Sequence, residues 1–170
     1  MAERFQGQVA LVTGGSSGIG RAAAVAFAAE GARVVVAARG EVESEETVQL
    51  IRDAGGEAIA VRTDVAVASD VESLVDRTVE AYGRLDCAFN NAGTSGGSGP
   101  IHEVEEDSWD QVLSINLKGV WLCMKYQIPQ MLSQGGGTIV NTSSDAGLIG
   151  WSGSAVYTAS KWGGIGLTKS

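Results

Sequence analysis

Short runs of β-branched and other apolar residues alternate along the chain with longer amphipathic segments rich in alanine. The runs at 9–13, 33–38, 58–62, 85–90 and 138–142 have the length and composition of strands. The segments at 18–30, 43–54, 69–82, 107–132 and 154–170 have helical spacing. Strands that are apolar on both faces and separated by helices predict a parallel sheet covered on both sides, and right-handed crossovers make it doubly wound. We therefore expect one α/β domain over residues 1–170.

Two local features refine this prediction. The long helix at 107–132 has Asp107 as its expected N-cap and Pro129 near its end. The loop at 93–100 is too rich in glycine and serine to form a regular element.

The composition excludes several classes of protein. Hydrophobic residues make up 44% of the 170 residues and charged residues only 19%, which is typical of a globular chain. The net charge of −8 provides no basic surface for nucleic acid. No apolar run approaches the roughly 20 residues that cross a bilayer, and Met1 to Gln8 lack the apolar core of a secretory signal. Cys87 and Cys123 have no metal-like spacing and are expected to be buried apolar side chains of a reduced, cytoplasmic protein.

A glycine-rich turn, TGGSSGIG at 13–20, joins the first strand to the first helix. A dinucleotide pyrophosphate needs a tight turn, close approach to the backbone and a free helix N-terminus. The spacing differs from the common G-x-G-x-x-G pattern, and such a turn also suits a merely flexible connection. The residues expected to contact the dinucleotide here are Gly14, Ser16, Ser17, Gly18, Ile19 and Gly20.

The end of the second strand bears on the choice of cofactor. Enzymes that select the unphosphorylated dinucleotide usually place an acid there, but this strand ends in Ala37-Ala38-Arg39. A guanidinium pairs with a 2′-phosphate, so the sequence favours NADP(H) over NAD(H). Arg39 is alternatively a simple surface residue, and nearby acids would repel a phosphate if they faced it. These acids are Glu41, Glu43, Glu45 and Glu46.

A third group of polar residues lies near the end of the sequence. Tyr157 and Lys161 are four residues apart on a predicted helix, so they share one face. A fixed cation favours the phenolate and makes a tyrosine a better proton-transfer group. Ser143 and Ser144 follow the fifth strand, where a hydroxyl would hydrogen-bond a substrate oxygen. A bare Tyr-x-x-x-Lys pair is otherwise a common solvated helix face.

These three sites together resemble the short-chain dehydrogenase/reductase family. Asn90-Asn91-Ala92-Gly93 is similar to the family motif after the fourth strand, and Asp64-Val65 is similar to the pair that contacts the adenine. Asn116 is similar to the helix asparagine whose main chain holds a water of the proton relay. The segment YTASK at 157–161 resembles the active-site motif, and the resemblance extends from Gln8 to Ser170.

The resemblance implies a Rossmann-like fold and a role for each site residue. Ser144, chosen over Ser143 by its offset from the tyrosine, would orient the substrate oxygen, and Tyr157 would exchange its proton. Lys161 would favour the phenolate and bind the nicotinamide ribose, with Asn116 linking it to solvent. Asp64, Val65, Asn91, Ala92, Gly93, Tyr157 and Lys161 would also contact the cofactor. Hydride would pass between the nicotinamide and a ketone or secondary alcohol.

The resemblance also implies what the intact protein should contain. The family continues with two more strands, a proline-glycine segment and a substrate lid, so we expect this domain to be incomplete at its C-terminal side. It often assembles through the fourth-crossover and Tyr-Lys helices, which predicts a homodimer or homotetramer of the intact protein.

Two rival interpretations are weighed against the enzyme. A hydrolase triad would have to use His102, the single histidine, but no nucleophile elbow surrounds either serine. A non-catalytic dinucleotide-binding or interaction protein would have no use for Ser144, Tyr157 and Lys161 together. Trp151 lies between Ser144 and Tyr157 and is a candidate for the substrate site, whereas Trp109, Trp121 and Trp162 are expected to pack.

Overall fold

The computed structural model describes residues 4–170, so the first three residues of the predicted domain lie outside the described part. Its strands are β1 (Val9–Thr13), β2 (Arg33–Ala38), β3 (Glu57–Arg62), β4 (Cys87–Asn90) and β5 (Thr138–Asn141). They form one parallel five-stranded sheet in the order β3-β2-β1-β4-β5. The reversal of order at β1 confirms the doubly wound, Rossmann-like fold that the sequence predicts.

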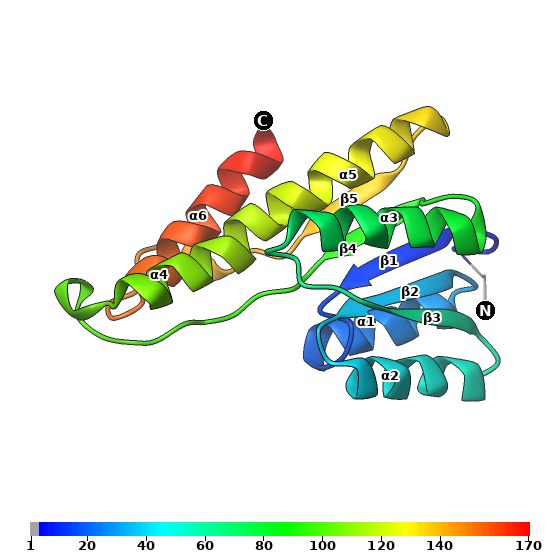
Figure 1. Ribbon diagram of the computed structural model, residues 1–170, viewed down its shortest axis with the longest axis horizontal. Coiled ribbons are helices and arrows are strands. Elements are labelled where there is room, and N and C mark those ends of the chain that lie inside the picture. The colour runs from blue at the N-terminus through cyan, green and yellow to red at the C-terminus, as the bar shows by residue number, and fades with distance from the viewer. Residues whose placement is uncertain (1–3) are drawn as a thin grey trace.

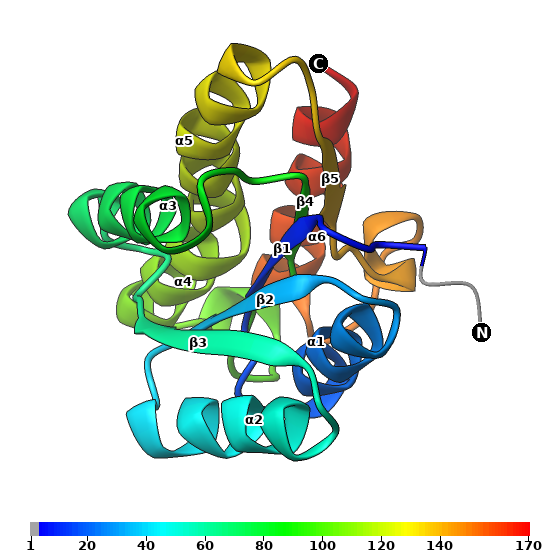
Figure 2. The ribbon, with the colours of Figure 1, turned by 90° about the vertical axis from the view of Figure 1, so that its right-hand side faces the viewer.

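Helices cover both faces of this sheet (Figures 1 and 2). They are α1 (Gly18–Ala29), α2 (Glu41–Asp53), α3 (Ala68–Tyr82), α4 (Glu106–Leu113), α5 (Gly119–Ser133) and α6 (Ala155–Lys169). Along β1, Val9 and Leu11 pack in a core with side chains of α3 and α5, while Ala10 and Val12 pack in a core with α1 and α2. This alternation follows from the two-residue period of a strand and explains why both faces of β1 are apolar.

The helix predicted at 107–132 differs from the observed one in two respects. Asp107 is not the N-cap, because the helix begins one residue earlier, with Glu105 as its cap. Glu106 and Asp107 lie in the first turn, where their charges face the positive end of the helix dipole. The helix is also not uniform, because the π-helical segment Ser114–Lys118 separates α4 from α5.

Within the described residues, the β5 strand lies at one edge of the sheet and pairs only with β4. Its side chains are more accessible than those of the inner strands, and Val140 is 53% exposed. Among the described helices none is both long and apolar enough to span a bilayer.

Asp86 joins the starts of three strands. Its carboxylate accepts a hydrogen bond from Val9 N (2.9 Å) and from Arg84 Nε and Nη2 (2.8 and 2.6 Å). Its backbone carbonyl accepts one from Thr138 N (2.8 Å). Burial raises the pKa of Asp86, but the hydrogen bonds from Arg84 and Val9 outweigh it and hold the pKa below its ordinary value.

We expect Asp86→Asn to lower the free energy of unfolding at neutral pH by about 1.5–3 kcal/mol, the usual size of a charged hydrogen bond. A lowered pKa stabilises the fold above the ordinary Asp value of about 4, and this stabilisation is lost as the pH falls through the folded-state value. Urea unfolding of both proteins should therefore show a difference in the free energy of unfolding that is constant from pH 7 to about pH 5 and shrinks as the pH falls toward about 3. Asp76→Asn, on the exposed face of α3, is the control. A difference that is independent of pH would contradict the assigned ion pair.

Candidate active site

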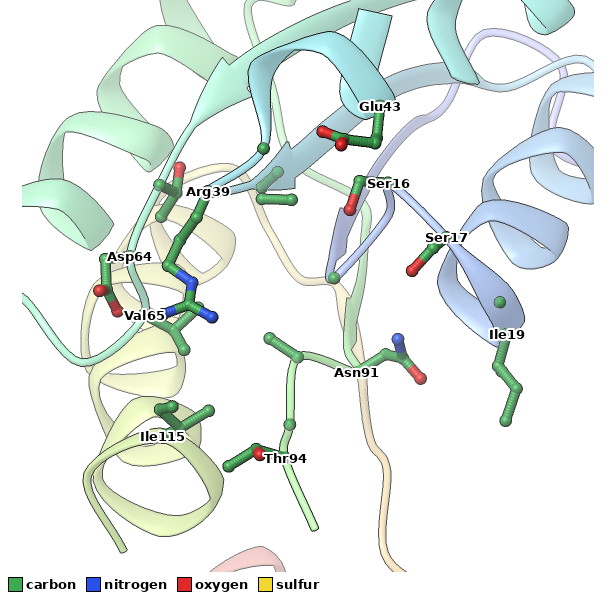
Figure 3. A pocket seen from close by; sticks show the side chains of 18 residues that line it. Ser16, Ser17, Ile19, Arg39, Glu43, Asp64, Val65, Asn91, Thr94 and Ile115 are labelled. Carbon is green, nitrogen blue, oxygen red and sulfur yellow. The ribbon is translucent and has the colours of Figure 1, made fainter. Parts of the chain in front are cut away.

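A cleft of about 630 Å³ lies at the carboxyl ends of the strands, where ligands of open parallel sheets bind (Figure 3). Its walls come from the turn after β1, the end of β2, the residues after β3 and β4, and the start of the π-helical segment. All predicted cofactor-binding residues except Gly20, Tyr157 and Lys161 line it. The residues found there are Gly14, Ser16, Ser17, Gly18, Ile19, Arg39, Asp64, Val65, Asn91, Ala92 and Gly93.

The glycine-rich turn has the backbone that the sequence requires of it. Gly14 has a φ of +66°, and a Cβ there would lie 3.0 Å from Ala92 Cα. Gly20 is packed even more tightly, because its added Cβ would overlap the Gly14 carbonyl oxygen and lie 2.8 Å from Asn91 Nδ2. The first turn of α1 contains no acidic residue, so its free N–H groups and positive dipole end remain available to an anion.

Thr13 ties this turn to the segment that follows β4. Its Oγ1 accepts hydrogen bonds from Asn91 N (3.0 Å) and Ala92 N (3.1 Å), and Asn91 Nδ2 donates to its carbonyl (3.4 Å). At the same time Gly14 N donates to Ala37 O (2.8 Å), which connects the turn with β2. Three adjacent strand ends are thus cross-linked around the floor of the cleft.

The predicted adenosine end of the cleft contains Arg39 and Asp64. Arg39 is exposed and extends along the cleft toward Val65 in Figure 3, and within residues 4–170 its side chain has no hydrogen-bond or ion-pair partner. Asp64 is partly engaged, because its Oδ1 accepts a hydrogen bond from Ala66 N (3.0 Å) and its own N–H donates to Asp70 (3.0 Å). Of the four acids that follow Arg39, Glu43 also lines the cleft.

Asn116 lies in the π-helical segment and is only 2% exposed. Its Oδ1 accepts a hydrogen bond from Thr94 N (2.8 Å), and its Nδ2 donates to Thr94 O (2.8 Å) and to Ser160 Oγ (3.2 Å). Ser160 Oγ in turn donates to Tyr157 O (2.7 Å). The asparagine therefore joins the loop beside the cleft to the helix that carries Tyr157 and Lys161.

Tyr157 and Lys161 lie on one face of α6, as their spacing predicts. Lys161 Nζ is 5.6 Å from the centroid of the Tyr157 ring and donates a hydrogen bond to Thr142 O (2.9 Å) just beyond β5. Burial lowers the pKa of Lys161, which is 6% exposed. The ammonium is thus held beside the phenol in a largely dry environment, where its charge acts more strongly than in water.

The two serines after β5 point in different directions. Ser144 caps a short 3₁₀ helix, Asp145–Gly147, by accepting a hydrogen bond from Ala146 N (3.2 Å), and its hydroxyl donates to Asp145 (2.8 Å). Ser143 Oγ instead donates to Lys161 O (3.4 Å). No hydrogen bond joins Ser144 to Tyr157 within the described residues, but α6 packs closely on the 3₁₀ helix, since a Cβ on Gly147 would lie 3.1 Å from Lys161 O.

Several residues of this region carried no recognised signal in the sequence. Thr94, Thr63 and Ile115 line the cleft, and Thr94 also holds Asn116. Ser160 connects Asn116 to Tyr157, although it stands directly before Lys161 in the active-site segment. His102 is exposed in the turn Ile101–Glu103 and faces its neighbour Glu103 rather than a serine.

The comparison with known families identifies this arrangement. The family model described as short chain dehydrogenase matches residues 8–170, which includes every element from β1 to α6. The chain belongs to the short-chain dehydrogenase family. Members of this family that resemble the chain carry the names of dehydrogenases and oxidoreductases.

Curated relatives and solved structures agree with this assignment. An uncharacterised oxidoreductase of Thermotoga maritima is 49% identical over 166 residues, which are 98% of this chain and 65% of that protein. A cyclohexanol dehydrogenase of Acinetobacter sp. is 40% identical over 99% of this chain and 67% of its own length. A short-chain dehydrogenase from Burkholderia phymatum in complex with NAD superimposes with a TM-score of 0.95 at 40% identity, over 99% of this chain and 60% of that one. A metagenomic short-chain oxidoreductase in complex with NADP has a TM-score of 0.93 at 38% identity, over 97% and 75% of the two chains.

The chain spans 60–65% of the length of the first curated relatives that it matches.

Proposed function

We propose that this chain supplies the cofactor-binding and proton-transfer residues of an enzyme that interconverts a ketone and a secondary alcohol with a nicotinamide cofactor, NADP(H) in preference to NAD(H). The observation that carries the proposal is the placement of Lys161 Nζ, 5.6 Å from the Tyr157 ring and bound to Thr142 O. A buried lysine fixed on the same face of α6 as a tyrosine is an arrangement suited to proton transfer, and a binding protein gains nothing from it.

The residues at the cleft fit a dinucleotide. The turn after β1 packs Gly14 and Gly20 closely against neighbouring atoms, and no side chain caps the start of α1, so the N–H groups of its first turn are left for an anion. Gly14, Ser16, Ser17, Gly18 and Ile19 would hold the pyrophosphate, and Asp64 and Val65 the adenine. When bound, the nicotinamide supplies or accepts the hydride.

The remaining steps belong to side chains of this chain. Tyr157 exchanges a proton with the substrate oxygen, and Ser144 orients that oxygen by a hydrogen bond. An ammonium group has three donors, and Thr142 O takes one from Lys161, so two remain for the cofactor ribose and the proton relay. Asn116 holds the relay in position through Thr94 and Ser160. A π-helical turn at this place is in keeping with such a role, because these turns are frequent at functional sites.

The direct test of the proposal is a spectrophotometric assay of the gene-encoded protein with NADPH or NADH and a panel of ketones that includes cyclic ones, because a curated relative acts on cyclohexanol. We expect oxidation of the cofactor that depends on both the ketone and Tyr157. Tight binding of the cofactor without turnover of any ketone or secondary alcohol would favour the non-catalytic interpretation.

Arg39 is the residue on which the preference for NADP(H) rests. We expect NADPH to bind more tightly than NADH and Arg39→Ala to reduce that ratio about ten- to a hundredfold, because a charged hydrogen bond is worth about 1.5–3 kcal/mol. Isothermal titration of both cofactors into both proteins measures the ratio. Tighter binding of NADH than of NADPH by the unchanged protein would overturn the proposed preference for NADP(H). The same affinity ratio in Arg39→Ala as in the unchanged protein would show that Arg39 does not determine the preference.

We also propose that the intact protein is a homodimer or homotetramer formed through α5 and α6. Both helices bear large exposed apolar side chains, among them Trp121 (45%), Leu132 (72%) and Trp162 (52%). The expectation that Trp109, Trp121 and Trp162 pack is wrong within this chain, because all three are exposed. Cys87 and Cys123 are unpaired thiols, which is the ground for placing the protein in the cytoplasm.

A further inference from the structure

Four glutamates follow Arg39 at the start of α2, next to the adenosine end of the cleft. From the sequence they are equivalent sources of negative charge, but the structure separates them. Three of them pair with arginines on the surface: Glu41 with Arg62 (3.7 Å), Glu45 with Arg52 (3.1 Å) and Glu46 with Arg21 (3.0 Å). These three charges are partly neutralised, and the three residues do not line the cleft.

Glu43 differs from the other three. It lines the cleft together with Arg39 and Gly40, and within residues 4–170 no arginine or lysine pairs with its carboxylate. Figure 3 shows its side chain on the same rim as Arg39 and opposite Asn91. A full negative charge therefore faces the cleft on the side where the ribose of the adenosine would lie.

The Glu43 side chain folds back over the first turn of α2. Gly40 is the N-cap of α2 and Glu43 is the third helical residue, the position from which a glutamate reaches back to the N-cap in a capping box. The side chain does fold back, because a Cβ added at Gly40 would overlap Glu43 Oε2. In addition, Arg21 Nη2 donates to Glu43 O (3.1 Å) and to Ser16 O, 2.6 Å away, so the first turn of α2 is tied to the glycine-rich turn. Glu43 thus occupies the anion position at the positive end of α2.

We propose that Glu43 is a second determinant of cofactor choice, one that opposes Arg39 by disfavouring a 2′-phosphate and accepting a hydrogen bond from a 2′-hydroxyl. This inference rests on the proposed binding of a nicotinamide dinucleotide in the cleft. A 2′-phosphate at this end of the cleft would be attracted by the Arg39 guanidinium and repelled by the Glu43 carboxylate. A 2′-hydroxyl is uncharged, so Arg39 would not repel it, and it would donate a hydrogen bond to Glu43. Arg39 and Glu43 together would give a moderate rather than an absolute preference for NADP(H) over NAD(H).

The test is Glu43→Gln, which removes the charge but keeps the length and shape of the side chain. We expect the affinity for NADPH to rise on the order of tenfold, the size of one partly screened unit charge, while the affinity for NADH falls or stays the same. Isothermal titration of each cofactor into the gene-encoded protein measures both. Added salt should reduce the gain for NADPH, because the repulsion is screened.

Glu45→Gln is the matched control, since it makes the same change of charge on the same helix at a residue outside the cleft. It should leave both affinities within about twofold. If Glu43→Gln left the ratio of the NADPH and NADH affinities unchanged, or if Glu45→Gln changed that ratio equally, the role of Glu43 would be overturned. The proposed function would remain intact in either case. If the unchanged protein bound neither cofactor, the proposed function would fail and this inference with it.

Discussion

Replacing Tyr157 by phenylalanine is expected to reduce turnover about 100- to 10,000-fold and to leave the affinity for the cofactor largely unchanged, because general acid–base steps contribute rate factors of this size. The substitution removes only the phenolic oxygen. The hydrogen bond from Ser160 reaches the backbone carbonyl of Tyr157, and Lys161 Nζ keeps its bond to Thr142 O. Steady-state kinetics with a ketone and calorimetric titration of NADPH separate the two effects.

Tyr126→Phe provides the matched control, because it removes the same oxygen from a half-buried tyrosine of α5 that also lies beside a lysine. The Tyr126→Phe variant should turn over the ketone at the same rate as the unchanged protein. Equal rates for Tyr157→Phe and the parent would end the assigned role of Tyr157. A loss of rate together with a loss of cofactor affinity in Tyr157→Phe would instead indicate damage to α6.

Gly20→Ala is expected to weaken binding of the cofactor about ten- to a hundredfold. The added Cβ would overlap Gly14 O and lie 2.7 Å from Gly14 C, both of which are backbone atoms of the turn that faces the cleft. Since Gly14 is fixed by its hydrogen bond to Ala37 O, α1 and the turn must separate. Overpacking of this kind costs about 1–3 kcal/mol, and here the strain falls on the conformation that binds the pyrophosphate.

The control for this substitution is Gly166→Ala. Gly166 is also helical, but a Cβ there would meet nothing within 4 Å, so the variant should bind normally and be slightly more stable. Thermal unfolding of all three proteins distinguishes a local effect from a global one. Binding by Gly20→Ala at the parent affinity would show that the turn accommodates a side chain and that its close packing is not needed for the cofactor.

The agreement between sequence and structure is closest where the pattern is local. The strand at 9–13 was predictable because its residues are apolar on both faces, and β1 is indeed central with both faces buried. The strand expected at 85–90 begins only at Cys87, because the backbone N–H and carbonyl of Leu85 are hydrogen-bonded to the Gln134 side chain and not to a neighbouring strand. Ends of elements depend on such contacts, which composition does not record.

The long helix shows why its interior was harder to predict than its existence. Its apolar spacing is helical throughout, and nothing in it marks a change of pitch. The π-helical segment is accompanied by three hydrogen bonds of the Asn116 side chain, to Thr94 N, Thr94 O and Ser160 Oγ. Thr94 is distant in sequence, so the contacts that accompany the irregular turn become apparent only once the chain is folded.

By itself, the sequence determined the alternation of strands and helices, the glycine-rich turn before α1 and the common face of Tyr157 and Lys161. All three depend on neighbours within a few residues, where the periods of strand and helix decide which side chains meet. Only the tertiary structure decided that Lys161 is buried against Thr142, that Asn116 is held between Thr94 and Ser160, and that Glu43 alone among the four acids faces the cleft. These properties depend on desolvation and on partners from other strands and helices, because the environment of a charge is set by what packs around it rather than by its position in the chain.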